Sequence, residues 1–335
     1  MTTAVETPSK SSNGILLLDK PTGISSFQAL YPVKRLFGKK VEGKKGAKVG
    51  HAGTLDPAAS GLLLVGIGAA TRLLEFLEGM PKSYRFVLHL GITTDSYDLD
   101  GEVLTRADAS GVTRAQIEAL LPRFIGDIEQ VPPAYSAIKI DGKRAYERAR
   151  AGEDVAMPAR PVHVSRLEIL SFDPGLRRED GESKAASAVM ELDCSKGTYV
   201  RTIAHDLGAL LGCGAVAEGI RRTAIGPYRV EDAVAPDAVR PEDLFPIASA
   251  VAHLTAYTLK PDGVAVLMNG NAVPPAGYAP RVRTEQQAKE AEAARAALPA
   301  VDDSVAAIFG PDDRLLAIGE VDARGQLQPR KVFPD

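Results

Sequence analysis

The sequence has few of the residues that mark extracellular, zinc-binding or membrane proteins. Its 335 residues include no tryptophan, and the two cysteines, Cys194 and Cys213, form no CxxC pair and have no histidine cluster beside them. This excludes a disulfide framework and a zinc ribbon and is typical of a reducing cytosol. No apolar run approaches the roughly 18 residues of a membrane span, and no basic-then-apolar signal pattern opens the chain. We therefore expect a cytoplasmic protein that does not enter membranes.

The overall composition is that of an ordinary globular protein, with 45% apolar and 25% charged residues. Its length suits one large domain with a smaller one, or two domains of middling size. The net charge of −3, taken as a total, argues against a nucleic-acid-binding protein. The charge is unevenly distributed along the chain, however, so local patterns carry more information than the sum.

A strongly basic segment spans residues 34–48. A solvated loop would account for such a run of charge. Its position directly before the loop at 50–61 favours a second interpretation, an arm that contacts nucleic-acid phosphates, since each cation can replace condensed counterions. Seven basic residues stand against one acid, Glu42, and the basic ones are Lys34, Arg35, Lys39, Lys40, Lys44, Lys45 and Lys48.

The loop at 50–61 holds the most distinctive residues of the chain. It reads GHAGTLDPAASG, and an apolar segment at 62–68 follows it directly. Pro57 restricts the backbone of Asp56, so one carboxylate is held at a stiff corner. Asp-Pro is also a common helix start, with the aspartate as N-cap. Here Ser60 and Gly61 would end such a helix within one turn, and 62–68 is typical of a buried strand.

The octet GHAGTLDP at 50–57, with ASG at 59–61, resembles the signature loop of the TruB family of tRNA pseudouridine synthases. The resemblance extends over residues 14–230 and includes a strand followed by DKPTG at 19–23. It implies an α+β pseudouridine synthase fold, with a mixed, largely antiparallel sheet and surrounding helices. It also implies a small β-rich, PUA-like domain at the C-terminus.

The domain organisation predicted from these patterns has three parts. Residues 1–12 are polar and are expected to be a disordered tail. Residues 13–255 are assigned to the catalytic domain, and 256–335 to the PUA-like RNA-binding domain. A run rich in Ala, Glu and Arg at 284–298 predicts a helical insertion in the latter.

Hydrophobic periodicity predicts the main helices and strands. One helix is expected from Ser25 or Ser26 with Phe27, Leu30, Val33 and Phe37 on its apolar face, a second from Thr113 to Phe124, and a third with Val200, Ile203, Leu207 and Leu210 on its apolar face. Strands are predicted at 14–18, 62–68, 83–91, 161–173 and 186–194, and short strands within 262–271 and 305–332.

The resemblance assigns the catalytic role to Asp56. Whether its carboxylate attacks the base, attacks the sugar or removes a ribose proton stays open. An ionised aspartate in a poorly solvated pocket needs a nearby cation. Arg201, in GTYVR at 197–201, matches the family's partner arginine, although without the motif it would pass for a surface arginine on a helix. Asp98 matches the acid that holds this arginine from its other side.

The resemblance also implies residues that bind or support the substrate. Tyr84 is expected to stack on a flipped uracil, although a strand tyrosine can equally fill a core. His51 is expected to contact RNA near the flipped nucleotide. Tyr199 and Ile220 are expected to line the base pocket, and Lys20 to support the active site.

The implied reaction is the isomerisation of uridine 55 in the tRNA T-loop to pseudouridine. It proceeds by base flipping and by aspartate-dependent cleavage and re-formation of the glycosidic linkage. No cofactor or metal is expected. The expected partner is the T-arm of tRNA, bound by a monomer without an obligate protein partner. Two alternatives are a tRNA-binding or remodelling protein with little catalysis and a guide-RNA-dependent relative. The compact length and the lack of a long basic tail argue against the second.

Overall fold

The computed structural model describes residues 13–38, 46–136, 138–140, 143–145, 148, 153, 157–175, 186–296 and 304–333. The tail predicted at 1–12, most of the lysines of the basic segment and the last residues of the predicted 284–298 insertion lie outside these ranges. Among the described residues, no helix is both long and apolar enough to cross a bilayer.

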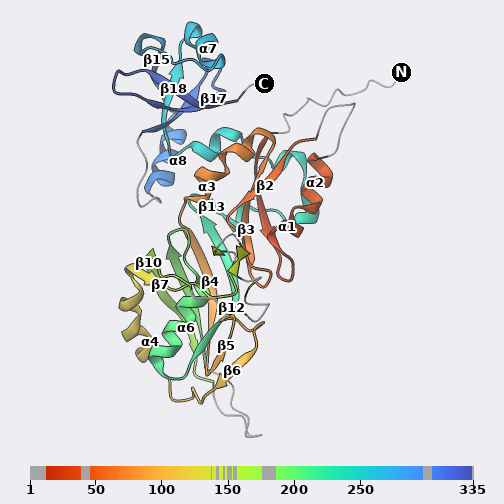
Figure 1. The fold of residues 1–335 in the computed structure, drawn as a ribbon, viewed down its shortest axis with the longest axis vertical. Coiled ribbons are helices and arrows are strands. Elements are labelled where there is room, and N and C mark those ends of the chain that lie inside the picture. Colours follow the sequence, from red (N-terminus) through yellow and green to blue (C-terminus); the bar gives the residue numbers. More distant parts are fainter. Residues whose placement is uncertain are drawn as a thin grey trace, which may run out of the picture.

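Two sheets organise the fold, and Figure 1 shows the smaller one at one end of an elongated molecule. The larger sheet has nine strands in the order β1-β3-β12-β4-β11-β10-β7, with β2 paired to β3 and β13 paired to β12. Its strands are β1 (Gly14–Lys20), β2 (Val49–Ala52), β3 (Ser60–Ile67), β4 (Lys82–Leu90), β7 (Gly126–Gln130), β10 (Arg160–Asp173), β11 (Ser187–Cys194), β12 (Ala215–Ile225) and β13 (Tyr228–Arg229).

The smaller sheet has the order β15-β14-β16-β17-β18. Its strands are β14 (Thr255–Leu259), β15 (Tyr278–Pro280), β16 (Val305–Phe309), β17 (Leu315–Val321) and β18 (Leu327–Val332). Two short hairpins pair β5 (Ile92–Thr94) with β6 (Val103–Arg106) and β8 (Lys139–Ile140) with β9 (Lys143–Arg144). The predicted fold class, α+β with a largely antiparallel sheet and a β-rich C-terminal part, is confirmed.

Helices cover the larger sheet and flank the smaller one. The α-helices are α1 (Ser26–Ala29), α2 (Tyr31–Phe37), α3 (Leu74–Glu78), α4 (Arg114–Leu120), α6 (Val200–Leu211), α7 (Pro261–Met268) and α8 (Glu285–Ala296). The 3₁₀ helices are Gly68–Leu73, Leu121–Phe124, Val230–Asp232, Pro236–Ala238, Pro241–Asp243, Ile247–Val251 and Pro275–Gly277. Ile117 of α4 and Ile203 of α6 pack in one core with Phe86 and Met190 of the sheet. Strict burial of alternate residues in β11 follows the period of a half-covered strand.

Three predictions about helices need correction. The helix expected from Ser25 to Phe37 is two helices, because Pro32 starts a second one at Tyr31. Phe27 lies on the outside, 55% exposed, and so does Leu210 on α6 at 42%. The strands expected within 262–271 are wrong, because Pro261 opens helix α7 there with Leu267 buried.

The two sheets share one apolar core. Ile15 of β1 and Leu64 of β3 belong to the same buried cluster as Phe309 of β16 and Phe333 after β18. The C-terminal sheet is therefore packed against the larger one rather than tethered to it. Residues at the end of β18 add polar contacts to this packing. Arg72 Nη1 donates to the Val332 carbonyl at 2.6 Å, and Lys331 Nζ donates to the Arg72 carbonyl at 3.0 Å.

One parallel pairing of strands, between β3 and β12, interrupts the otherwise antiparallel strand pairing in the described part of the larger sheet. At this contact, Ser60 and Gly61 of β3 lie beside Arg221 and Arg222 of β12. Gly61 has φ +101°, and a Cβ built there would lie 2.2 Å from the Arg222 carbonyl oxygen. Only glycine fits so close an approach of two backbones.

We predict that Gly61→Ala strongly lowers the free energy of unfolding. The positive φ alone costs about 1–2 kcal/mol, and the collision with the Arg222 backbone adds to this. Gly126→Ala is the matched control, because Gly126 has φ +94° but nothing within 4 Å of the added Cβ. Urea unfolding should show a clearly larger loss for Gly61→Ala. Equal losses in the two variants would contradict the role of the close approach.

Candidate active site

Asp56 lies in the loop that connects β2 to β3. No helix follows Pro57, because β3 begins at Ser60, so Asp56 is not an N-cap. The Asp56 carbonyl accepts a hydrogen bond from the Ala59 amide at 3.1 Å, which closes a tight turn. Gly53, with φ +72°, turns the chain out of β2. The loop thus emerges where β3 meets β12, near the middle of the larger sheet.

Three buried polar side chains hold this loop in place. The Ser26 hydroxyl donates to the Leu55 carbonyl at 2.9 Å and accepts from the Leu55 amide at 2.8 Å. Lys20 Nζ donates to the Pro57 carbonyl at 3.3 Å and to two carbonyls of its own turn. Arg222 donates from Nη2 to the Gly53 carbonyl and from Nε to the Leu62 carbonyl, both at 2.8 Å. The backbone on both sides of Asp56 is therefore fixed by groups that cannot move into solvent.

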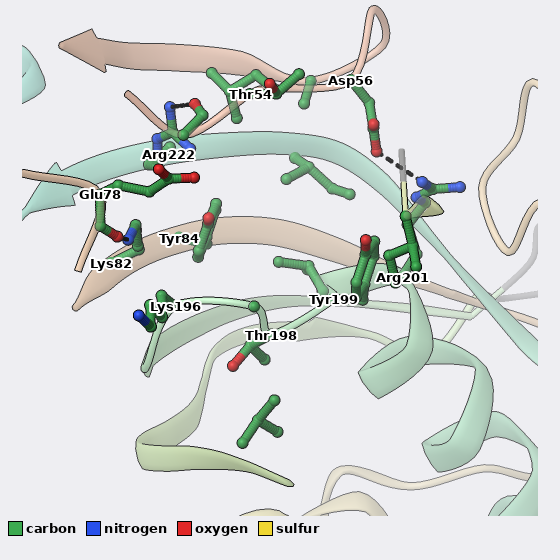
Figure 2. Close-up of a pocket in the computed structure, with 18 of the residues that line it drawn as sticks. Thr54, Asp56, Glu78, Lys82, Tyr84, Lys196, Thr198, Tyr199, Arg201 and Arg222 are labelled. Atoms are coloured by element: carbon green, nitrogen blue, oxygen red, sulfur yellow. Dashed lines mark hydrogen bonds and ion pairs between the residues drawn. The ribbon is translucent and has the colours of Figure 1, made fainter. Parts of the chain in front are cut away.

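The carboxylate of Asp56 forms an ion pair with Arg201. Arg201 is in the first turn of α6, and its side chain is only 5% exposed. Its Nη2 donates to Asp56 Oδ2 at 2.7 Å and to the Tyr135 carbonyl at 2.9 Å. Its Nη1 donates to the Ser96 carbonyl at 2.7 Å and lies 3.3 Å from Asp98 Oδ2. Four acceptors from three parts of the chain thus fix the guanidinium. Through the ion pair, which Figure 2 shows, the guanidinium orients Asp56.

Asp98 is held in turn by its own loop. Its Oδ1 accepts from Ser96 Oγ at 2.6 Å and from the Asp100 amide at 3.1 Å. Burial raises the pKa of Asp98, and the Ser96 hydrogen bond and the Arg201 charge oppose that rise. Tyr97, between these residues, has a φ of +64°. Its ring stacks on His205 of α6 with centroids 3.8 Å apart, which ties the loop to the helix that carries Arg201.

A cleft of about 1000 Å³ opens beside the ion pair. Asp56, Tyr84, Tyr199, Arg201 and Ile220 all line it. Figure 2 shows Asp56 and Arg201 at one end, with the two tyrosines between them and a polar end that holds Glu78, Lys82 and Lys196.

The two tyrosines of the cleft are fixed in different ways. Burial raises the pKa of Tyr84, and the Arg222 guanidinium acts in the opposite direction. Tyr199 is held through its backbone, because the Gln130 side chain accepts from its amide at 2.7 Å and donates to its carbonyl at 3.0 Å. The Tyr84 ring is therefore held by the core before any ligand arrives, and the Tyr199 backbone is held by the Gln130 amide.

The solvation of Asp56 differs from what the sequence led us to expect. Its side chain is 47% exposed, whereas that of Arg201 is 5% exposed. The carboxylate therefore lies at a water-accessible wall of the cleft rather than in a poorly solvated pocket. The buried member of the ion pair is the cation, Arg201. Among the described residues, Asp56 Oδ1 accepts no hydrogen bond, so one oxygen stays free to act on a ligand.

The structure brings most of the predicted site residues together. Lys20 and Asp98 do not line the cleft but contact the Asp56 loop and Arg201 from behind. His51 is not among the cleft residues and lies on β2 instead. Its Nδ1 is buried without a hydrogen-bond partner in the described chain. Burial lowers the pKa of His51, and the charges of Arg222 and Lys34 lower it further.

Three residues that build this site were not among the predicted site residues. Ser26 was expected only as a possible start of a helix, and neither Gln130 nor Arg222 was predicted to have a role in the site. Arg222 is 1% exposed and is the largest fully buried side chain. Its position in a strand among Ile220, Ala224 and Ile225 was the available signal, because an arginine there must bury its stem. In the described part of the chain, no three His, Cys, Asp or Glu residues lie close enough to hold a metal ion.

Comparison with known proteins places this geometry in a family. Residues 34–200 match the model of the TruB family pseudouridylate synthase N-terminal domain, and 201–244 match that of the tRNA pseudouridylate synthase B C-terminal domain. The chain is 37% identical to the tRNA pseudouridine synthase B of Pseudomonas aeruginosa (strain UCBPP-PA14), over 97% of both chains. It is 38% identical to the enzyme of that name from Thermobifida fusca (strain YX), over 96% of this chain and 99% of the relative.

Solved structures of other proteins have a similar fold. One is an H/ACA RNP bound to a substrate RNA containing 2′-deoxyuridine, with a TM-score of 0.63 and 22% identity. Another is a Cbf5-Nop10-Gar1 complex, with a TM-score of 0.65 and 24% identity. Each match covers 96% of this chain and 85% of the other. At this identity they establish the fold alone.

The buried lysine beside the Asp56 loop gives a prediction about pH. Burial lowers the pKa of Lys20 to about 8, although the Asp56 charge opposes the shift and Arg222 adds to it. Between pH 8 and about 10.5, the folded protein has released a proton that the unfolded chain still binds. This contribution therefore makes the free energy of unfolding rise with pH in that window. Lys20→Met should remove it and flatten the slope in urea titrations.

Lys82 provides a matched comparison for this measurement. Its pKa is also lowered to about 8, chiefly by burial, and it lies at the polar end of the cleft. Lys82→Met should flatten the rise of the free energy of unfolding in the same pH window, without removing a contact of the Asp56 loop. If Lys20→Met left the slope of the wild-type protein unchanged, the assignment of the shift to Lys20 would be wrong.

Proposed function

The chain belongs to the TruB family of tRNA pseudouridine synthases, and on that premise we propose that it converts uridine 55 in the T-loop of tRNA to pseudouridine. Relatives named tRNA pseudouridine synthase B match it at 37–38% identity over nearly its whole length. The observation that carries the proposal is the Asp56–Arg201 pair at 2.7 Å, placed in a cleft with two tyrosines. A carboxylate with one free oxygen, beside aromatic side chains that can stack on a planar base, suits chemistry on a nucleobase.

The reaction breaks the C1′–N1 bond of uridine and forms a C1′–C5 bond to the same uracil. One proton leaves C5 and one is gained at N1, so no atom is gained or lost overall. The target base must first leave its stack, because the reacting carbons are out of reach inside a folded loop. What the protein supplies is a pocket for the flipped base, a carboxylate and exclusion of water during the exchange.

We assign the carboxylate role to Asp56 and a positioning role to Arg201. A guanidinium at 2.7 Å favours the ionised form of a carboxylate and orients it. Arg201 can hold this position without substrate because two carbonyls accept from its Nη groups and Asp98 lies 3.3 Å from Nη1. A buried charge with fewer partners would be costly to maintain.

We assign the binding of the flipped uracil to the aromatic and apolar side chains of the cleft. Tyr84 offers a fixed ring for stacking, and Tyr199 and Ile220 complete the wall. The nucleotide would also displace water from Asp56, whose side chain is half exposed in the free protein. Closure of the site by the substrate itself would then provide the dry environment that the chemistry needs.

The rest of the proposal concerns how tRNA is held. The basic segment at 34–48 and the PUA-like unit at 256–335 are proposed to contact the RNA backbone, and His51 to contact a nucleotide near the target. We further infer a cytoplasmic monomer that needs no obligate protein partner. A guide-independent enzyme should modify a T-arm stem-loop in the absence of any other RNA.

The central test is Asp56→Asn, assayed by pseudouridine formation on a T-arm stem-loop and on full-length tRNA. The amide has the same shape but neither charge nor basicity, so we expect the rate to fall at least about a hundredfold while tRNA binding is retained. Asp100→Asn is the matched control, because Asp100 is an exposed acid of the loop that carries Asp98.

Each outcome of this test separates two functions. Lost activity with retained binding supports a catalytic Asp56. Activity that survives Asp56→Asn would refute the assignment, and wild-type protein that binds tRNA but makes no pseudouridine would favour the remodelling alternative. A requirement for an added guide RNA would favour the other alternative.

A further inference from the structure

Two aromatic rings on α1 and α2 point away from the core. Phe27 is 55% exposed and Tyr31 is 51% exposed, although Leu30 and Val33 between and beside them are fully buried. The two rings contact each other edge to face, with centroids 5.5 Å apart and an interplanar angle of 84°. Lys34 places its Nζ 3.7 Å from the centroid of the Phe27 ring. We refer to Phe27, Tyr31 and Lys34 as the aromatic platform.

The local structure of α1 does not depend on these rings. Ser25 caps the helix through a capping box with Gln28, and Ser26 fixes it to Leu55. The side chains that anchor α1 and α2 to the sheet are Ala29, Leu30 and Val33, which belong to a buried cluster. Phe27 and Tyr31 are outside that cluster. Exposed apolar rings gain little from burial within this chain, so their grouping with a cation points to a ligand.

The platform is directly connected to the Asp56 loop. Ser26, the residue before Phe27, exchanges two hydrogen bonds with Leu55, the residue before Asp56. On its other side, the charge of Lys34 reaches His51 of β2 closely enough to contribute to its lowered pKa, after burial and Arg222. Figure 1 shows α1 and α2 next to each other beside β2 and β3. Phe27 and Tyr31 are not among the cleft residues, so the platform lies outside the pocket for the target base.

The stretch of sequence that carries the platform has charges of one sign only. The stretch 26–38 contains Lys34 and Arg35 and no acidic residue. Exposed rings interleaved with cations are the usual means of holding unpaired nucleotides, since every base presents a π-face and every nucleotide a phosphate. A protein partner would more often meet a larger apolar patch with a polar rim.

We propose that an unpaired base of the substrate RNA stacks on the Phe27 ring and meets the perpendicular Tyr31 ring at its edge, with Lys34 on its phosphate, outside the cleft that takes the target uridine. The proposal rests on the function proposed above and adds a second contact point for the same RNA. The stacked base belongs to the tRNA but is not the one that reacts. Loss of the platform therefore weakens RNA binding without changing the chemical step at saturating RNA.

The first test measures tRNA affinity by filter binding. Phe27→Ala with Tyr31→Ala should weaken binding about tenfold, as expected for loss of a stacked base. Leu36→Ala is the matched control, because Leu36 is also on α2 and 44% exposed but has no ring. Lys34→Gln should weaken binding and reduce the dependence of log affinity on log salt by about one, whereas the ring variants keep the wild-type slope. Thermal unfolding midpoints check that each variant is folded.

The second test uses the absence of tryptophan from the chain. Phe27→Trp introduces a single tryptophan whose fluorescence should be quenched when a base stacks on it. Leu36→Trp is the control and should respond little to the same RNA. Full-length tRNA and an isolated T-arm stem-loop, titrated separately, show whether the stacked base is in the T-loop or elsewhere in the tRNA. Quenching by either RNA supports the platform.

The two proposals fail in different ways. Wild-type protein that makes no pseudouridine would overturn the proposed function. If the wild type is active but the double alanine variant binds tRNA with unchanged affinity, the platform proposal alone is overturned. The same holds if the fluorescence of Phe27→Trp is not quenched by saturating tRNA. A double variant that loses the single-turnover rate at saturating RNA would also contradict it, because the rings would then act on the chemistry.

Discussion

The buried guanidinium of Arg201 is the constraint on which the rest of the site depends. A charge that is almost fully removed from water must be matched by acceptors, and here the acceptors come from the Asp56 loop, from Tyr135 and from Ser96 and Asp98 of one loop. These segments are remote from one another in sequence. Satisfying one cation therefore brings together the segments that hold Asp56 and Arg201 at the cleft.

The second constraint is the parallel contact between β3 and β12. It brings Gly61 against the backbone of Arg222, and the buried Arg222 side chain then reaches back to the Gly53 carbonyl. Both ends of the Asp56 loop are thus held by the same residue. With Lys20 and Ser26 on the other side, the loop has little freedom. Rigid support of this kind lets a half-exposed carboxylate keep one orientation without being buried.

Much of this architecture could be predicted from the sequence, and the failures have physical causes. The loop motif identified Asp56, and the spacing of apolar residues found the main strands because their period of two is local. The ion pair with Arg201 came from a motif, since nothing in the periodicity of α6 indicates an arginine that turns inward. The roles of Arg222 and Ser26 were not predicted because their partners are backbone carbonyls and amides, which leave no trace in a sequence. Helix α7 was missed because its valines favour strands, whereas Pro261 and tertiary packing decided the outcome.

The core shared by the two sheets has a consequence for substrate choice. Because Ile15 and Leu64 pack in one cluster with Phe309 and Phe333, the span from the cleft to the C-terminal sheet is set by close-packed side chains. The distance between the cleft and the C-terminal sheet is therefore fixed. An RNA that touches both places must hold its target uridine at a matching separation from its second contact. Recognition then depends on the distance and angle between two points of a folded RNA. A loop with the right bases on a helix of the wrong length could not make both contacts.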